Sequence, residues 1–278
     1  MNEIERLELE YGWIAPKLDE FDVRRFENVK YPEELISFPN DAYAGENLSR
    51  DDFWSRFRVK LIANSLYKNN IKCLWEVGGG DGRVAISLGK LGYEVVAVEP
   101  IQSGARKLAK NGLKTFNSRL EDLSLPNESL QAIGIFDVLE HIRDEKMFLE
   151  EIRRVLKLGG KLFLTVPAHS WLFSGHDKAL GHYRRYNRKS LIKTLSSAGM
   201  KVVEIRYVFA TLIIPALALR RIPYKLGFKR KANINLQESE GSLRLPKWFD
   251  SILFKVVQLE YKFKFRFGLS LFVVCKKQ

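Results

Sequence analysis

The residues best suited to chemistry lie where an apolar run ends in an acid and a turn of glycines. They are Glu76, Gly78, Gly80, Gly82 and, seventeen residues later at the end of a β-branched run, Glu99. Glycines allow a sharp turn from strand to helix with positive φ and let a ligand approach the backbone closely. A carboxylate at the tip of the second strand can accept both hydroxyl groups of a ribose. The pattern therefore predicts a βαβ unit that binds a nucleotide.

The glycine spacing and the charge of Glu76 narrow the choice of nucleotide. A dinucleotide fingerprint reads Gly-x-Gly-x-x-Gly, and counted from Gly78 its third glycine would fall on Arg83. Glu76 would repel a pyrophosphate but attract a ligand that carries an ammonium and a sulfonium group. S-adenosylmethionine has both groups and a ribose, so we expect this cofactor and disfavour a nicotinamide dehydrogenase. The alternative is a glycine-rich turn without a ligand.

Residues 73–191 resemble the class I S-adenosylmethionine-dependent methyltransferases. Within that class they resemble the small-molecule group that includes ubiquinone and menaquinone biosynthesis enzymes. The matching stretches are Glu76-x-Gly78-x-Gly80-x-Gly82, Glu99, Glu121-Asp122-Leu123, Phe136–His141 and Leu158–Leu162. A narrower resemblance, over residues 166–186, is to a bacterial subgroup with a His-Tyr-Arg-Arg-Tyr segment. The resemblance implies an α/β fold with a seven-stranded Rossmann-like sheet, helices on both faces, and S-adenosyl-L-methionine as cofactor.

The resemblance also implies which residues complete the cofactor site. Arg119 stands where many relatives have an acid, so adenine recognition is expected from the backbone amide of Leu120 and from Glu121 or Asp122. Phe136 ends the fourth predicted strand, beside the expected methyl group. The Asn/Asp-Pro-Pro-aromatic motif of enzymes that methylate base amines is missing at this point, which argues against that reaction.

A dense group of aromatic and charged residues follows the fifth predicted strand. In this fold such a loop lies at the carboxyl edge of the sheet, where ligands bind. Aromatic side chains would cover a flat or apolar acceptor, and arginines would clamp a carboxylate or phosphate. The predicted acceptor-binding residues are Trp171, Asp177, Tyr183, Arg184, Arg185 and Tyr186. The alternative is a buried structural network in which the arginines pair with neighbouring acids.

Three histidines are candidates for the base that deprotonates the acceptor. His141 faces the methyl site in similar enzymes, and His176 and His182 lie in the loop after the fifth strand. The alternative for His141 is a capping or packing role. A metal site built from His176, Asp177 and His182 lacks a cysteine or third histidine at ligand spacing, so we expect no metal.

The net charge of +13 is concentrated in the last quarter of the chain. Residues 201–278 hold sixteen Lys and Arg against five Asp and Glu. A basic surface there favours an anionic partner, which would be acidic lipid, nucleic acid or a phosphorylated substrate. The alternative is charge that serves solubility alone.

Three features predict a cytoplasmic protein. The two cysteines, Cys73 and Cys275, suggest no disulfide framework, and the charged N-terminus has no apolar signal segment. The longest apolar stretch, residues 208–219, is interrupted by Pro215 and is too short to span a bilayer. Peripheral contact with the inner face of the membrane stays open.

The candidate catalytic and binding residues must be positioned by alternating strands and helices. Apolar runs predict strands near 72–77, 94–99, 114–117, 131–136, 161–166, 201–209 and 269–275, and helices near 82–91, 102–111, 144–156 and 188–198. Another helix is predicted to start at Ser49, and Asn187 and Gly199 are predicted to bound the last core helix. The domain organisation is an N-terminal extension (1–48), a methyltransferase core (49–209), a helical insert or lid (210–268) and a final core strand (269–278).

The insert combines apolar and basic residues around a polar link, residues 229–245. Two apolar-basic helices are expected, and they suggest a lid or an interfacial membrane contact. The alternative is packing on the sheet or on the second subunit of a homodimer.

Together these features predict methyl transfer from S-adenosylmethionine to the oxygen or carbon of a small-molecule or lipid-linked acceptor. One alternative is an RNA methyltransferase that uses the basic surface. Another is a non-catalytic S-adenosylmethionine-binding protein that docks on a membrane or a partner.

Overall fold

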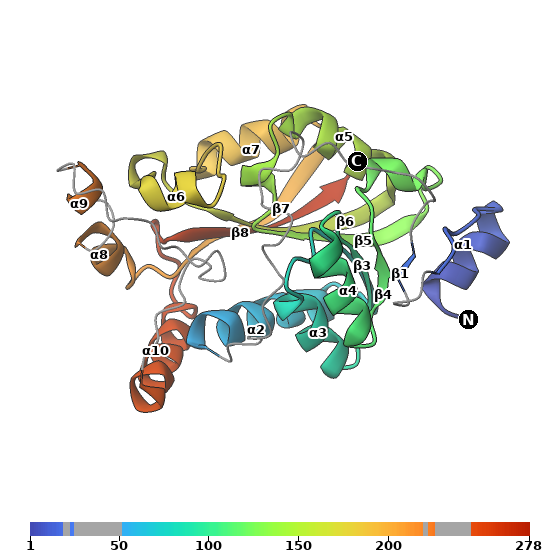
Figure 1. Cartoon of the computed structure of the whole chain (residues 1–278). Helices are drawn as coiled ribbons and strands as arrows, with labels where there is room; N and C mark the ends of the chain where they lie inside the picture. The colour runs from blue at the N-terminus through green and yellow to red at the C-terminus, as the bar shows by residue number, and fades with distance from the viewer. Residues whose placement is uncertain (19–22, 25–51, 219–221, 226–245) are drawn as a thin grey trace.

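The computed structural model describes residues 1–18, 23–24, 52–218, 222–225 and 246–278, which form one mixed sheet flanked by helices (Figure 1). The strands are β1 (Val23–Arg24), β2 (Cys73–Val77), β3 (Glu94–Val98), β4 (Lys114–Phe116), β5 (Leu130–Phe136), β6 (Leu156–Pro167), β7 (Met200–Val208) and β8 (Ser270–Lys277). The α-helices are α1 (Glu3–Tyr11), α2 (Phe53–Lys68), α3 (Arg83–Lys90), α4 (Gln102–Lys110), α5 (Glu145–Val155), α6 (Gly175–Ala179), α7 (Arg188–Ser197), α8 (Ile213–Ala216), α9 (Ile222–Lys225) and α10 (Lys247–Glu260). Short 3-10 helices are η2 (Glu121–Leu123), η3 (Leu139–His141) and η4 (Ser170–Leu172).

The strand order is β1-β4-β3-β2-β5-β6-β8-β7, with β8 antiparallel to both of its neighbours. The chain runs outward from β2 to β4 on one side and from β5 to β6 on the other. The order therefore reverses between β2 and β5, and ligands of open α/β sheets bind outside the carboxyl ends of strands at such a point. The predicted Rossmann-like α/β fold is confirmed.

Among the described residues the sheet has eight strands, where the sequence predicted seven. The additional strand, β1, comes from the predicted N-terminal extension and pairs in parallel with β4. It is two residues long, which is too short to give an alternating hydrophobic pattern.

Alternation along the central strands produces one core on each face of the sheet. Trp75 of β2 packs in one core with α1, α5 and α7. Leu74, the preceding residue, packs in the other with α2, α3, α4 and part of α10. Side chains of consecutive strand residues point to opposite faces, so apolar strands of this kind need helices on both.

Capping residues define the helix ends that orient the site. Asn187 accepts a hydrogen bond from the backbone of Ser190 at the start of α7, and Gly199 has a φ of +73° just after it, as predicted. For α2 the cap is Asp52, which accepts from the backbone N–H of Ser55 at 2.8 Å. The predicted start at Ser49 lies outside the described residues.

Part of the predicted insert is anchored on α2 through α10. Asp250 of α10 accepts from the backbone N–H of Phe53 at 2.7 Å and pairs with Arg56. Glu260 accepts from the backbone N–H groups of Ala210 and Thr211. Within the described ranges, no helix is long and apolar enough to cross a membrane. The predicted polar link, residues 229–245, lies outside those ranges.

Candidate active site

The turn after β2 brings backbone, rather than side chains, to the switch point of the sheet. Gly78, Gly80 and Gly82 all have positive φ, at +77°, +54° and +82°. A Cβ atom at Gly78 would lie 2.5 Å from a methyl carbon of Val138. Since L-residues rarely adopt this conformation and Gly78 has no room for a side chain, glycine is required there.

Glu76 is a buried acid with one unsatisfied oxygen beside this turn. Its side chain is 3% exposed, and its Oε2 atom has no hydrogen-bond partner among the described residues. Burial raises the pKa of Glu76 to about 8, against the opposing effect of the nearby Arg58 charge. A buried carboxylate oxygen without a donor is costly, so this position favours a ligand that brings a cation or an N–H group.

Glu99 approaches the same turn from the end of β3. Its carboxylate accepts from the backbone N–H groups of Gly80 at 2.7 Å and Ile101 at 2.8 Å. Burial raises the pKa of Glu99 to about 7, although these two hydrogen bonds lower it. The structure thus brings both predicted acids to one turn.

Of the residues predicted to bind adenine or to lie beside the methyl group, Glu121 faces solvent, and the others are buried or held in an ion pair. Leu120 is fully buried in the core, and Phe136 is buried on the opposite face. Arg119 holds Asp122 through two hydrogen bonds, of 2.7 and 2.9 Å. Glu121 is exposed, although desolvation raises its pKa. Of the two acids proposed for adenine, Glu121 is therefore the one not held by this ion pair.

Arg58 is a site residue that the sequence analysis missed. It reaches from α2 to Asp137, just past the end of β5, with its Nη1 2.8 Å from Oδ2. Thr165 of β6 donates to the other oxygen of Asp137 at 2.9 Å. Asp137 has a φ of +57°, which is uncommon for a non-glycine residue and often marks a functional site. The only sequence signal for Arg58 was its place on a helix that leads into β2.

The loop after β6 is organised around Asp177, which is fully buried. Its Oδ1 accepts from Nε of Arg185 at 2.5 Å and lies 3.0 Å from Nδ1 of His182. Its Oδ2 accepts from the backbone N–H of Ser174 at 2.8 Å. Burial alone would raise the pKa of Asp177, but His182 and Arg185 outweigh it and lower the pKa to about 2.

A second acid, Glu145, holds the neighbouring part of the same loop. Arg184 lies 2.9 Å from its carboxylate, and the Tyr186 hydroxyl donates to it at 2.6 Å. Both predicted clamp arginines therefore have acidic partners in the protein, as the alternative of a structural network describes. Trp171 and Tyr183 are exposed at the surface. Their predicted contact with an acceptor stays a prediction.

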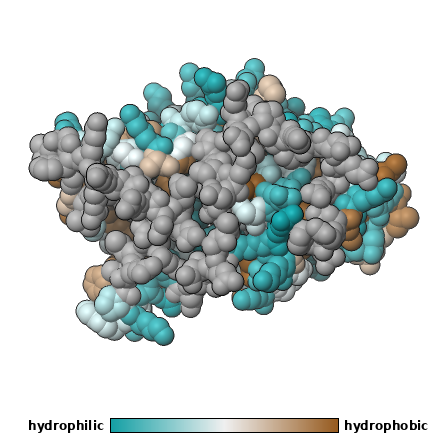
Figure 2. All heavy atoms as spheres, in the orientation of Figure 1, coloured by the Kyte–Doolittle hydropathy of each residue, from teal (hydrophilic) through white to brown (hydrophobic). Residues whose placement is uncertain are grey.

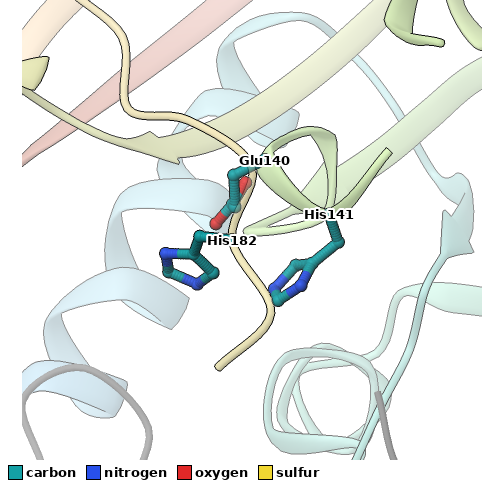
Figure 3. A group of neighbouring side chains, drawn as sticks. All are labelled: Glu140, His141 and His182. Carbon is teal, nitrogen blue, oxygen red and sulfur yellow. The ribbon is translucent and has the colours of Figure 1, made fainter. Parts of the chain in front are cut away.

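Two of the three candidate histidines meet beside a third group (Figure 3). The rings of His141 and His182 are 4.7 Å apart and nearly perpendicular. Glu140, which is 1% exposed, joins them, and one ligand atom from each residue lies within 4.8 Å of the other two. His176 is not in this group. Desolvation and the neighbouring His182 lower the pKa of His141 to about 3, so His141 is neutral at physiological pH; a hydrogen bond to the Gly181 backbone opposes this shift.

A surface groove of about 860 Å³ lies along β7, away from the predicted site residues. Its lining includes Lys68, Arg188, Arg206, Tyr261 and Phe263. It contributes nothing to the acid–glycine turn.

Comparison with known proteins points to one family. A model of the methyltransferase domain matches residues 49–205, which is more than half of the chain. The chain is 24% identical over 166 residues to a probable S-adenosylmethionine-dependent methyltransferase of Mycolicibacterium smegmatis, covering 58% of this chain and 65% of the relative. It is 27% identical over 176 residues to a ubiquinone biosynthesis O-methyltransferase of Rickettsia conorii, covering 59% and 60%. The chain thus spans less than two thirds of the length of these relatives.

Among solved structures, the chain is similar to a crystal structure of the cyclase SpnF. The TM-score is 0.53 at 18% identity, and the match covers 86% of this chain and 90% of the other. At that identity the likeness shows the fold alone.

Proposed function

Because this chain belongs to the methyltransferase domain family of S-adenosylmethionine-dependent enzymes, we propose that it transfers a methyl group from S-adenosylmethionine to an oxygen of a small-molecule or lipid-linked acceptor. A carbon acceptor is the second choice. The observation that carries the proposal is the unsatisfied, buried Oε2 of Glu76 beside three glycines in left-handed conformations.

The residues around this turn fit the cofactor. Glu76 would accept from the ammonium group, since a cation both satisfies the orphaned oxygen and favours its ionised form. Glu99, already directed at the turn through Gly80, would accept from the ribose hydroxyls. Backbone from Gly78 to Gly82 would lie against the ligand. The bound cofactor supplies an electrophilic methyl group on a positively charged sulfur.

The carboxyl ends of β5 and β6 would receive the acceptor. Arg58 and Thr165 fix Asp137 at the end of β5, and the Glu140, His141 and His182 group lies just beyond it. His182, whose ring is oriented by Asp177, would take the hydroxyl proton as the oxygen forms its bond to the methyl carbon. The carbon–sulfur bond breaks in the same step, and its electron pair stays on sulfur. The protein's main contribution is alignment of the reacting atoms and exclusion of water.

A lipid-linked acceptor is supported by the surface of α10. Trp248, Ile252, Val256 and Leu259 are exposed at helical spacing along one side of this helix, with Trp248 67% exposed. Residues 262–267 follow, an exposed alternation of basic and phenylalanine side chains. Figure 2 shows hydrophobic and hydrophilic side chains together at the lower-left corner, where Figure 1 places α10. An apolar stripe flanked by cations fits the surface of an anionic bilayer.

Calorimetry with the purified chain tests the cofactor, and labelled methyl transfer tests the acceptor. We expect saturable binding of S-adenosylmethionine and no binding of NAD. With a radiolabelled methyl group and cell extract as the source of acceptors, label should enter the lipid or small-molecule fraction. Saturation by NAD without binding of S-adenosylmethionine would refute the proposal. Label in RNA would support the RNA alternative, and binding with no labelled product would support the non-catalytic one.

A further inference from the structure

The cluster of Glu140, His141 and His182 has the composition of a metal site. We propose that these three side chains bind one divalent transition-metal ion, with Zn²⁺ the preferred ion. The potential ligand atoms, one from each side chain, all lie within 4.8 Å of one another. Figure 3 shows the carboxylate and the two rings gathered between η3 and the segment around residue 182.

Neighbouring groups hold both histidines in orientations that suit ligation. Nδ1 of His182 lies 3.0 Å from Asp177, whose other contacts are to Arg185 and Ser174, so Nε2 is left for the cluster. One ring nitrogen of His141 bonds to the backbone of Gly181, and the ring packs nearly perpendicular to that of His182. A carboxylate or carbonyl behind each ring is the usual arrangement around a metal-bound histidine.

Charge and burial agree with a cation at this position. Glu140 and His182 are buried, and Asp177 carries a second negative charge directly behind His182. Arg185 pairs with Asp177, and Arg58 with Asp137, so these two arginines are already engaged elsewhere. The carboxylate of Glu140 provides the negative charge that lowers the cost of placing a divalent ion away from water.

The donor set selects the class of metal. Two imidazole nitrogens and one carboxylate oxygen suit Zn²⁺, Co²⁺, Fe²⁺ or Mn²⁺, whereas Mg²⁺ and Ca²⁺ prefer oxygen alone. Three protein ligands also leave a coordination position open, as in catalytic zinc sites.

The role of the ion rests on the proposed function. At the open position the acceptor hydroxyl would become a ligand, and the metal would lower its pKa. With the ion bound, the metal takes the place of the histidine base: the hydroxyl proton passes to water, and both histidines act as ligands. Ligand spacing along the chain predicted no metal, because Glu140 lies 42 positions before His182 and only the fold brings the two together.

Absorption spectroscopy with Co²⁺ tests the site without any measurement of activity. Metal-depleted whole chain is titrated with Co²⁺, and we expect visible d–d bands that saturate at one ion per chain and disappear when Zn²⁺ is added. His141→Ala and His182→Ala should each abolish the bands. His169→Ala is the matched control, since His169 stacks on Tyr207 outside the cluster, and it should keep them. Asp177→Asn should weaken binding by roughly 10- to 100-fold.

Binding of S-adenosylmethionine to each variant reports whether its fold is intact. Absence of saturable bands in the wild type would overturn the site, as would wild-type bands in folded His141→Ala and His182→Ala. Methyl transfer by the metal-depleted enzyme at the full rate would overturn the catalytic role alone. Absence of methyl transfer with every acceptor would count against the proposed function, while the Co²⁺ titration would still decide the metal site.

Discussion

The two halves of the candidate site are built in opposite ways. On the cofactor side, backbone forms the surface, and the two acids beside it have raised pKa values, about 8 for Glu76 and about 7 for Glu99. On the acceptor side, charged side chains hold one another, and Asp177 has its pKa lowered to about 2 by His182 and Arg185. Beside the glycine turn, Glu76 has a buried oxygen without a hydrogen-bond donor, whereas in the loop after β6 Asp177 and Glu145 each hold an arginine.

The difference indicates where each half obtains its stabilisation. Glu76 lacks a partner for one buried oxygen, so cofactor binding should relieve a cost that the protein bears alone. On the acceptor side, Asp177 and Glu145 are already paired with Arg185 and Arg184, so the loop that they hold should be rigid before any ligand arrives. Substitutions in the two halves should therefore affect different quantities: affinity for the cofactor on one side and stability on the other.

Arg185→Met should give the largest effect, a loss of stability. It leaves the fully buried Asp177 without its cationic partner, and breaking a buried pair in this way costs about 3–5 kcal/mol. Chemical denaturation measures the loss. If Arg185 instead serves mainly to clamp the acceptor, the free energy of unfolding will stay near that of the wild type while KM rises.

Gly78→Ala should give the next largest effect, a loss of affinity for S-adenosylmethionine. Its Cβ would meet Val138 at 2.5 Å and force the turn to move, for which we expect a loss of about 3 kcal/mol, roughly 100-fold in Kd for S-adenosylmethionine. Gly92→Ala is the control, because Gly92 also has positive φ but has no atom near its Cβ position. Calorimetry gives the Kd of each variant for S-adenosylmethionine and so separates the effect of backbone strain from that of crowding at the turn. Equal Kd values for the two variants would contradict the prediction.

Glu76→Gln should weaken cofactor binding by about 1.5–3 kcal/mol, the value of a hydrogen bond to a charged group. The amide keeps the shape of the side chain but loses the charge that attracts the ammonium. Stability without cofactor should stay the same or increase, since a buried acid is removed. A fall in stability with unchanged Kd would reverse the assigned role.

The raised pKa values of Glu76 and Glu99 predict the dependence on pH. Both groups bind protons more tightly in the folded protein than at their ordinary value of 4.5, so their stabilising contribution is complete below pH 4.5 and is lost as pH rises through about 7 and 8. Binding of a cationic ligand favours ionised Glu76, so it should release protons near pH 7. Calorimetry in buffers of different ionisation enthalpy measures this release, which Glu76→Gln should reduce.

The smallest effect on stability should come from Trp248→Ser in α10. An exposed side chain contributes within about 0.5 kcal/mol, so the unfolding midpoint should barely move. Binding to phosphatidylglycerol vesicles should nevertheless fall, and Leu158→Ser, an exposed leucine on β6, should leave it unchanged. Equal vesicle binding by the two variants, or equal binding to uncharged phosphatidylcholine, would argue against a membrane role for α10.

Local patterns predicted most of the frame and the cofactor half. Hydrophobic alternation located the central strands, and the turn needed only residues close in sequence, because Gly78, Gly80 and Gly82 act through their own backbone. Two features did not follow from these patterns: β1 spans only two residues, and α2 is capped by Asp52, whereas the predicted cap, Ser49, lies outside the described residues.

The sequence by itself determined the α/β alternation, the acid–glycine turn and the class of ligand that this turn favours, because each depends on neighbours along the chain. Tertiary structure alone decided which side chains meet on the acceptor side. Arg58 reaches Asp137 across 79 positions, and Glu140 and His182 come from different crossover segments. Contacts of that range follow from how strands and helices pack in three dimensions, and spacing along the chain does not encode them.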